Sequence, residues 1–330
     1  MLRKTVENNM LLHKRRSWFF ILLLLALFTA SCQPAPPTSQ VNSSEPSIIP
    51  SDRDRVFGII FPMAFPAYEK ITENAEETAK AANIRLLVSA PDEANLEQQI
   101  RIMESMIKQK VDGIAIAPVN PEALAPVINK AVEQGIPVIC FETDSPGSKR
   151  LSYIGSDNYE TGRQLGKATD LLLNGKGMVL VGTGMPEMDS LKERLEGLLN
   201  YLNDETEIEV LEVRYNDGRE DLAITEQEEM INAHPHFNAF LSLDFVSSSA
   251  SILIWKAYGL NRHVLSIGAT PKIEEALLNG QVTSIISQYE NQWGRKIIEA
   301  LMKVSEGEII PEMIDTGILK LEKGPQDDQR

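Results

Sequence analysis

The chain has 330 residues and a formal net charge of −15, and 43% of its residues are hydrophobic. This acidic balance disfavours nucleic acids and anionic membrane surfaces as partners. Two cysteines and four histidines are too few for a Cys/His metal cluster, so we expect no metal and no cofactor.

The first 32 residues combine a basic start, a short apolar run and a cysteine that follows small residues. The run 18–28 is shorter than the roughly 20 residues of a membrane-spanning helix and is typical of a secretory signal. Its ending, Thr29-Ala30-Ser31-Cys32, resembles the lipobox of bacterial lipoproteins, with Thr29 where that motif most often has Leu. This resemblance implies lipid attachment at Cys32. An uncleaved membrane anchor is the alternative, and either interpretation places the remaining chain outside the cytoplasm.

The segments beyond Cys32 differ sharply in composition. Residues 33–54 are rich in Pro and Ser and predict a flexible linker, and 324–330 predict a frayed tail. The signal segment carries a net charge of +4, so the chain without it would carry −19. Because the body at 55–323 exceeds what one hydrophobic core usually holds, we expect two lobes.

Short apolar strands alternate with amphipathic helices throughout this body. Such alternation predicts parallel sheets covered on both faces, and two consecutive sets predict an α/β fold of two doubly wound lobes. The expected strands are 55–61, 84–89, 113–117, 137–141, 178–181, 209–214, 239–243, 263–267 and 282–287. The expected helices are 68–83, 96–108, 121–134, 159–173, 191–202, 221–233, 247–258 and 272–278.

Ligands of such sheets bind at the carboxyl ends of the strands, where loops and helix N-termini converge. The residues that follow these strands are aromatics, carboxylates and amides, together with one arginine, Arg194. No Gly-x-Ser-x-Gly motif is present, and Gly182-Thr183-Gly184 lacks the third glycine of a phosphate-binding loop. Planar polar groups beside aromatic faces suit a polyhydroxylated ring, which favours a binding protein over an enzyme.

Several segments carry a more specific pattern. They are GIIFPMAFPAYEKITENAEETA, VDGIAIAPVNPEAL, GIPVICFETDSPGSKRLSYIGSDNYETGRQLG, KERLEGL, AHPHFNAFLSLD and NGQVTSIISQYENQWG. From about Val56 to Leu321 the chain resembles the sugar-binding lipoproteins of ABC importers, in the ribose/galactose-binding cluster of periplasmic binding proteins. The resemblance implies two lobes, 55–156 plus 289–316 and 157–288 plus 317–323, joined by three crossing strands that act as a hinge.

The resemblance also assigns ligand-binding roles, residue by residue. The positions that match are Tyr68, Glu142, Asp144, Arg194, Asp244 and Gln288, and Phe65, close to Tyr68, is also expected to contact the ligand. Two positions depart from the pattern, since Phe65 stands where ribose binders have Asn and Gly268 where most members have Asp. Each buried sugar hydroxyl left unmatched would cost roughly 1–3 kcal/mol, so the sequence predicts a larger, less hydroxylated or partly apolar ligand. Nanomolar affinity for ribose would contradict this prediction.

Each candidate residue also has a purely structural interpretation. Tyr68 and Phe65 could be packing residues, and Glu142 and Asp144 could be turn or capping carboxylates. Arg194 could form a surface ion pair with a neighbouring glutamate. These alternatives remain open at the level of sequence.

The sequence therefore favours a monomeric, lipid-anchored extracytoplasmic protein that captures a sugar-like ligand and delivers it to an ABC permease. A receptor for a membrane sensor kinase or a chemoreceptor is the alternative, because the same closure of two lobes can signal. An extracytoplasmic enzyme is less favoured, since no catalytic constellation is present and neither catalytic residues nor a cofactor are predicted.

Overall fold

The computed structural model describes residues 54–323, which belong to one compact unit. The predicted signal segment with Cys32, the linker up to residue 53 and the tail at 324–330 lie outside the described residues. Within 54–323, no helix combines the length and the apolar character needed to cross a membrane.

The first lobe is built on a six-stranded sheet in the order β11-β5-β4-β3-β1-β2, and every neighbouring pair in it is parallel. Its central strands β3, β4 and β5 are buried along their whole length, as expected of a sheet covered on both faces. The strands are β1 (Arg55–Ile60), β2 (Ile84–Ser89), β3 (Gly113–Ile116), β4 (Val138–Phe141), β5 (Ser152–Gly155) and β11 (Met313–Asp315).

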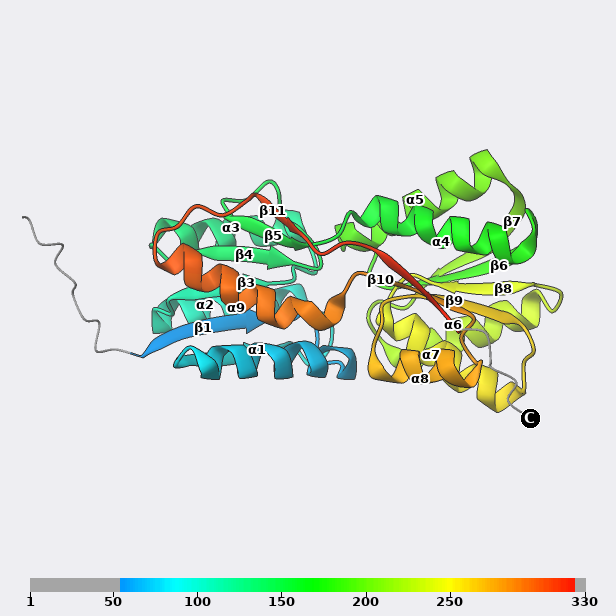
Figure 1. Ribbon diagram of the computed structural model, residues 1–330, viewed down its shortest axis with the longest axis horizontal. Helices are drawn as coiled ribbons and strands as arrows, with labels where there is room; N and C mark the ends of the chain where they lie inside the picture. The colour runs from blue at the N-terminus through cyan, green and yellow to red at the C-terminus, as the bar shows by residue number, and fades with distance from the viewer. Residues whose placement is uncertain (1–53, 324–330) are drawn as a thin grey trace, which may run out of the picture. The chain divides into compact units, whose positions relative to one another are not determined.

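Helices cover both faces of this sheet (Figure 1). Asn95 and Asn120 begin two of them, since each side chain accepts a hydrogen bond from the backbone N–H three residues later, at 2.9 Å. Trp293 is fully buried on the face covered by α1 and α9. The helical elements are η1 (Pro66–Tyr68), α1 (Glu69–Ala81), α2 (Leu96–Gln109), α3 (Pro121–Glu133), η2 (Glu290–Gln292) and α9 (Trp293–Ser305).

The second lobe is built on a sheet in the order β12-β10-β9-β8-β6-β7, parallel except for the antiparallel edge strand β12. Its strands are β6 (Lys176–Thr183), β7 (Glu207–Tyr215), β8 (Ala239–Ser242), β9 (His263–Ile267), β10 (Ser284–Ser287) and β12 (Leu319–Glu322). Its helices are α4 (Asn158–Leu173), α5 (Asp189–Glu205), α6 (Glu220–Ala233), α7 (Phe245–Tyr258) and α8 (Pro271–Asn279).

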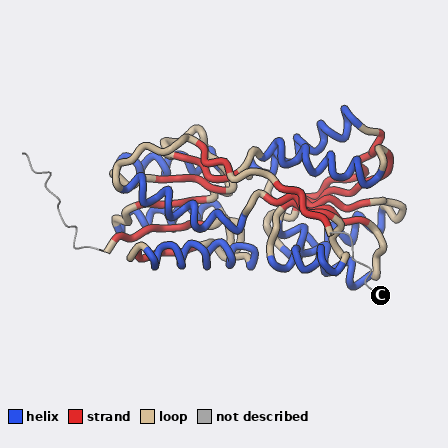
Figure 2. Tube along the Cα trace, viewed as in Figure 1, coloured by secondary structure: helices blue, strands red, loops and turns tan. Residues whose placement is uncertain are grey.

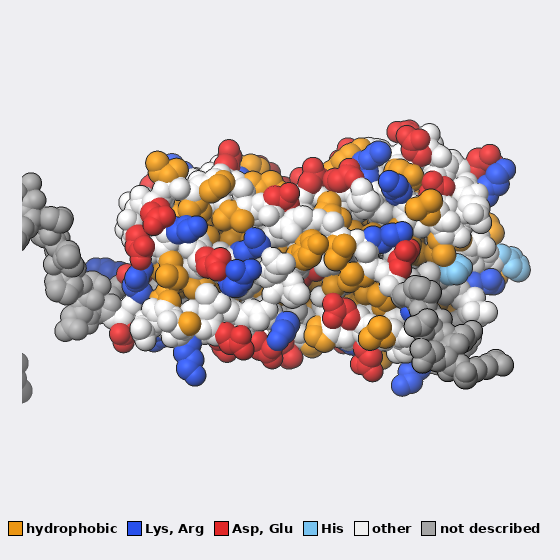
Figure 3. All heavy atoms as spheres, viewed as in Figure 1, with side chains coloured by type: hydrophobic (Ala, Val, Ile, Leu, Met, Phe, Trp, Pro, Cys, Tyr) orange, Lys and Arg blue, Asp and Glu red, His pale blue; other side chains and the backbone are white. Residues whose placement is uncertain are grey.

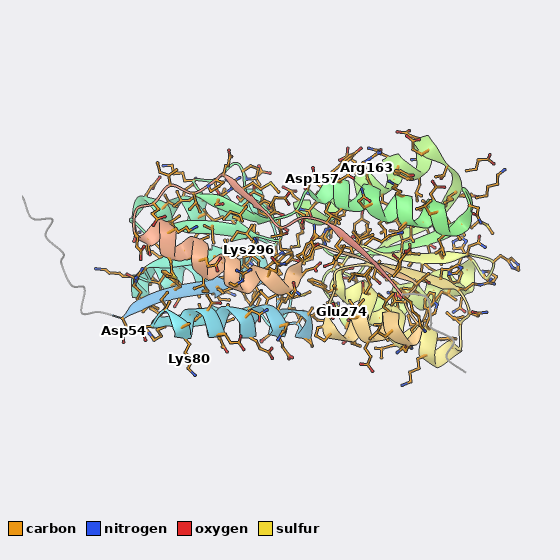
Figure 4. The ribbon with its side chains drawn as sticks, viewed as in Figure 1. Asp54, Lys80, Asp157, Arg163, Glu274 and Lys296 are labelled. Atoms are coloured by element: carbon orange, nitrogen blue, oxygen red, sulfur yellow. The ribbon has the colours of Figure 1, made fainter. Side chains whose placement is uncertain are left out.

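The chain passes between the two sheets three times, after β5, after β10 and after β11 (Figure 2). Asp157, labelled in Figure 4, lies at the first crossing, where its side chain caps α4. The crossings are bonded to one another: Ser156 Oγ lies 2.9 Å from Thr316 Oγ1, which donates to the carbonyl of Gln288 at 2.7 Å. Hydrogen bonds thus couple the three connections directly.

The predicted fold class of two doubly wound α/β lobes is confirmed. Element bounds differ in places: the strand expected at 178–181 is the longer β6, and the one expected at 282–287 begins only at Ser284. The strands β5, β11 and β12 are not among the predicted strands; β11 and β12 lie at sheet edges and are largely exposed, so they lack the apolar run that marks a buried strand. Cys140 is fully buried in β4. This burial raises the pKa of its thiol, so the thiol stays protonated and unreactive, as predicted for a core cysteine.

Candidate functional site

Arg194 owes its position to a close approach of two helices in the second lobe. A Cβ on Gly162 of α4 would lie 1.9 Å from the carbonyl oxygen of Arg194, and one on Gly197 would lie 2.0 Å from that of Tyr159. Only residues without a Cβ allow α4 and α5 to pack backbone against backbone here. Arg194, three residues before Gly197, lies at this contact between the two helices, and only 4% of its surface is exposed.

The guanidinium of Arg194 joins α5 to the hinge. It donates to Asn158 Oδ1 at 2.9 Å, to the carbonyl of Leu243 at 3.1 Å and to Gln288 Oε1 at 2.8 Å. Gln288 Nε2 in turn donates to Asn158 Oδ1 at 3.1 Å and to Thr161 Oγ1 at 3.0 Å. All of these side chains are buried, so Arg194 is the centre of an internal network and not part of a surface ion pair.

Asp244 follows β8 and caps the next helix. Its carboxylate accepts from the backbone N–H of Val246 at 3.0 Å and from that of Ser247 at 3.3 Å. Asn216, at the end of β7, donates to the same carboxylate at 3.2 Å and to Ser247 Oγ at 2.9 Å. Burial raises the pKa of Asp244, and these hydrogen bonds oppose the rise.

Tyr68 and Glu142 come together in the first lobe. The Tyr68 hydroxyl donates to Glu142 Oε2 at 3.1 Å, and within 54–323 it is the only hydrogen-bond donor to that carboxylate. Glu142 follows β4 with a φ of 60°, a left-handed conformation that is uncommon for a residue with a side chain. The carboxyl group is thus buried, strained in its backbone and sparsely bonded.

Burial sets the ionisation of this group. It raises the pKa of Glu142 from 4.5 to about 7, while Arg194 and the Tyr68 hydroxyl oppose the rise and Glu290 and Asp244 add to it. Burial likewise raises the pKa of Tyr68, with the nearby Glu142 contributing. Arg194 and Asp244, which belong to the second lobe, thus act on the charge of this first-lobe pair.

The two lobes touch directly around these residues. The rings of Tyr68 and Phe245 meet edge to face, with centroids 5.8 Å apart and an interplanar angle of 89°. Thr143 Oγ1, next to Glu142, lies 2.5 Å from Ser190 Oγ on α5. A cavity of about 470 Å³ also has walls from both lobes, among them Phe65 on one side and Thr270 on the other.

The structure brings together five of the predicted site residues: Tyr68, Glu142, Arg194, Asp244 and Gln288. Phe65 is half-buried and lines the two-lobe cavity. Asp144 makes no hydrogen bond to this group within 54–323: Arg150 holds it in a bidentate ion pair with N–O distances of 2.6 and 2.7 Å. It lines a neighbouring cavity of about 370 Å³ together with Asn158 and Ser190 of the second lobe.

Three further residues of this region are not among the predicted ligand-binding residues, although Asn216 and Phe245 follow expected strands. Asn158 and Asn216 hold the ligand candidates in place, and Phe245 contacts the opposite lobe. Asn158 lies in the quoted segment, in the crossover after β5, and the other two directly follow strands. Position after a strand was therefore the signal that could have identified them.

A model of the periplasmic binding protein domain matches residues 57–309. The chain belongs to this family. Members of this family are substrate-binding proteins and not enzymes, so the chain is not an enzyme. Membership of the family also implies a location outside the cytoplasm. On the face shown in Figure 3, acidic and basic side chains of this periplasmic binding protein are interspersed.

Similar proteins have been characterised in several organisms. The chain is 23% identical over 311 residues to a D-ribose/D-allose-binding protein of Pseudomonas aeruginosa, covering 90% of this chain and 95% of that one. It is 20% identical over 305 residues to the ribose import binding protein RbsB of Bacillus subtilis, covering 92% and 97%. An ABC transporter solute-binding protein of Burkholderia graminis, solved with D-arabinose, has a TM-score of 0.77 at 26% identity, covering 82% and 96%.

Proposed function

We propose that the chain is an extracytoplasmic solute-binding lipoprotein that captures a sugar or sugar-like ligand between its lobes and delivers it to an ABC importer. The observation that carries the proposal is a contact between the lobes: Tyr68, which bonds Glu142 in one lobe, meets Phe245 of the other lobe, next to Asp244. Relatives that bind ribose, allose or arabinose support a sugar as the ligand class. Cys32 would carry the lipid.

The chemistry of the site suits a carbohydrate ring. A carboxylate and a guanidinium can accept and donate paired hydrogen bonds to neighbouring hydroxyls, while an aromatic ring covers C–H groups. A ligand that contacts both lobes stabilises the closed arrangement and leaves the open one unaffected. The hinge of this motion would lie near Gly155–Asp157, Ser287–Tyr289 and Asp315–Gly317, between lobes 55–156 plus 289–316 and 157–288 plus 317–323.

A thermal-shift screen of the full chain in detergent tests sugar binding. A sugar at about a thousand times its Kd should add roughly 4 kcal/mol to the free energy of unfolding, a shift of several degrees. The Arg194→Lys variant keeps the charge and loses the planar donor geometry, so the shift should shrink. An unchanged shift in this variant would place the ligand elsewhere, and no response to pentoses, hexoses or inositols would overturn sugar binding.

Anchoring and delivery need their own tests. Labelled fatty acid should enter the wild-type chain in cells and be absent from a Cys32→Ser variant. If the chain delivers its ligand to an ABC permease, sugar uptake by cells should depend on both proteins. In vesicles that contain the permease, the chain should stimulate transport. Sugar binding without stimulation of any permease would favour the receptor alternative.

A further inference from the structure

We infer that the ligand is a sugar with an apolar edge, a deoxy sugar, and that Phe245 is the residue that selects it. This inference rests on the proposed sugar-binding function and narrows it to one class of ligand. It is carried by the aromatic surface between the lobes and by the small number of polar groups that remain free to bind a hydroxyl.

The first observation is the packing of Phe245 at the end of the second sheet. A Cβ on Gly268, which follows β9, would lie 2.3 Å from Phe245 Cε1 and 2.7 Å from its Cδ1. The ring therefore lies directly over the Cα of Gly268. Gly268 also has a φ of +96°, which side-chain-bearing residues rarely adopt. The Phe245 ring, 7% exposed, thus fills the space that a side chain at position 268 would take.

The second observation is that this surface continues into the first lobe. Phe245 contacts Tyr68 edge to face, Tyr68 stacks on Phe61 with centroids 4.7 Å apart, and Phe61 meets Phe141 at 5.6 Å. The four rings form a run that crosses from one lobe to the other, and it is buried between them, with exposed fractions from 0% for Phe141 to 7% for Phe245. A ligand therefore reaches the rings at the lobe contact, Phe245 and Tyr68, only when the lobes part. A hydroxyl placed against their faces would have no strong hydrogen-bond partner there.

The third observation is how few polar groups near this run have hydrogen-bonding capacity to spare. The amides of Gln288 and Asn216 are engaged with protein partners. Within residues 54–323 the carboxylate of Glu142 accepts from Tyr68 alone, and Arg194 uses three of its five N–H groups. In the same part of the chain, the buried hydroxyls of Thr183, at the end of β6, and Ser266, on β9, have no hydrogen-bond partner. These groups can bind one end of a sugar, whereas the ring run faces the rest.

Together these observations predict a ligand that is polar on one side and apolar on the other. A methyl group in place of a hydroxymethyl group, or a missing ring hydroxyl, would lie against Phe245 and Tyr68 without losing a hydrogen bond. An apolar pocket discriminates against an added hydroxyl by about 10- to 100-fold, which is the preference we expect.

The test uses matched pairs of sugars on the full chain in detergent, measured by titration calorimetry. The pairs are D-fucose with D-galactose, L-rhamnose with L-mannose, L-fucose with L-galactose, and 2-deoxy-D-ribose with D-ribose. In at least one pair the deoxy member should bind about 10- to 100-fold more tightly. If the fully hydroxylated member binds equally well or better in every pair that binds, the inference is wrong while sugar binding stands. If no member of any pair binds, both the inference and the sugar-binding proposal are wrong.

Variants of Phe245 then test the assigned residue. Phe245→Asn offers the ligand a polar partner and should reduce the deoxy preference to within about twofold, whereas Phe245→Leu keeps an apolar surface and should retain it. Urea unfolding of each variant shows whether it is folded. A preference that survives in folded Phe245→Asn would assign the selectivity elsewhere. Because the comparison of paired sugars on the wild-type chain needs no variant, the ligand class remains testable even if Phe245→Asn does not fold.

Discussion

Arg194 and Gln288, which join the second lobe to the hinge, are held by several hydrogen bonds within the protein. In contrast, the carboxylate of Glu142 in the first lobe accepts a hydrogen bond from Tyr68 alone among residues 54–323. The second-lobe network rests on a rigid framework, because two glycines let α4 and α5 pack backbone against backbone. The difference indicates that one half of the site is preorganised, while the other keeps a carboxyl group whose bonding and charge can change. Each prediction below perturbs one half.

The largest effect is expected in the rigid half. Gly162→Ala would place a Cβ 1.9 Å from the carbonyl of Arg194, so α4 and α5 must separate and the free energy of unfolding should fall by about 4 kcal/mol. Gly147→Ala is the matched control, because a Cβ there meets nothing within 4 Å. Urea unfolding measures both variants. Equal stability of the two variants would show that the packing of α4 on α5 does not constrain Arg194.

The next effect concerns the sparsely bonded half. Because the pKa of Glu142 rises from 4.5 to about 7 on folding, the folded chain holds a proton between these values that the unfolded chain has released. The free energy of unfolding therefore falls as pH rises through this range. Glu142→Gln removes this fall in the free energy of unfolding. The variant should be more stable than wild type by about 3 kcal/mol at pH 8 and should differ little from it at pH 4.

The difference between wild type and Glu142→Gln reports on Glu142 together with its coupling to two neighbouring carboxyl groups. Asp244 and Glu290, whose own pKa values are raised by burial, are present in both proteins, and their charges are part of what raises the pKa of Glu142. Urea midpoints at pH 4, 6 and 8 give the comparison. A difference that does not change with pH would contradict the assignment. The same variant should bind sugar more weakly, because a neutral amide accepts hydrogen bonds less strongly than a carboxylate.

Features of the fold and the site that depend on residues close together in the chain could be predicted from the sequence, and features that depend on distant residues could not. The alternation of apolar strands and helices predicted the fold, and position after a strand, with the resemblance, identified Tyr68, Glu142 and Arg194. The sequence could not show that Glu142 lacks other partners or that Phe245 covers Gly268, because both depend on contacts between residues far apart in the chain. Asp144 lies two residues after Glu142, and the sequence could not show that its carboxylate pairs with Arg150.

A smaller effect is expected where the second lobe caps α7. Asp244→Ala removes the acceptor of two backbone N–H groups and leaves the Asn216 amide with one partner fewer, so it should cost about 2 kcal/mol of stability. Asp157→Ala removes a cap at the start of α4, where the bond to the backbone N–H of Glu160 is solvent-exposed, and should cost about 1 kcal/mol. Only the Asp244 variant should also weaken sugar binding. Equal affinities in the two variants would remove Asp244 from the site.

The smallest effect separates Asp144 from Glu142. Arg150 donates to both oxygens of Asp144 and, at 3.2 Å, to the carbonyl of Glu312. Through Arg150, the ion pair therefore joins two segments of the first lobe. Asp144→Asn should lower the free energy of unfolding by about 1 kcal/mol, because the pair is partly exposed to solvent. Since the ion pair and the backbone N–H of Ser145 together use three of about four acceptor positions of this carboxylate, sugar affinity should stay within about twofold of wild type. A tenfold loss of affinity without loss of stability would instead show that Asp144 leaves Arg150 to contact the ligand, and that the first lobe contributes two carboxylates to the site.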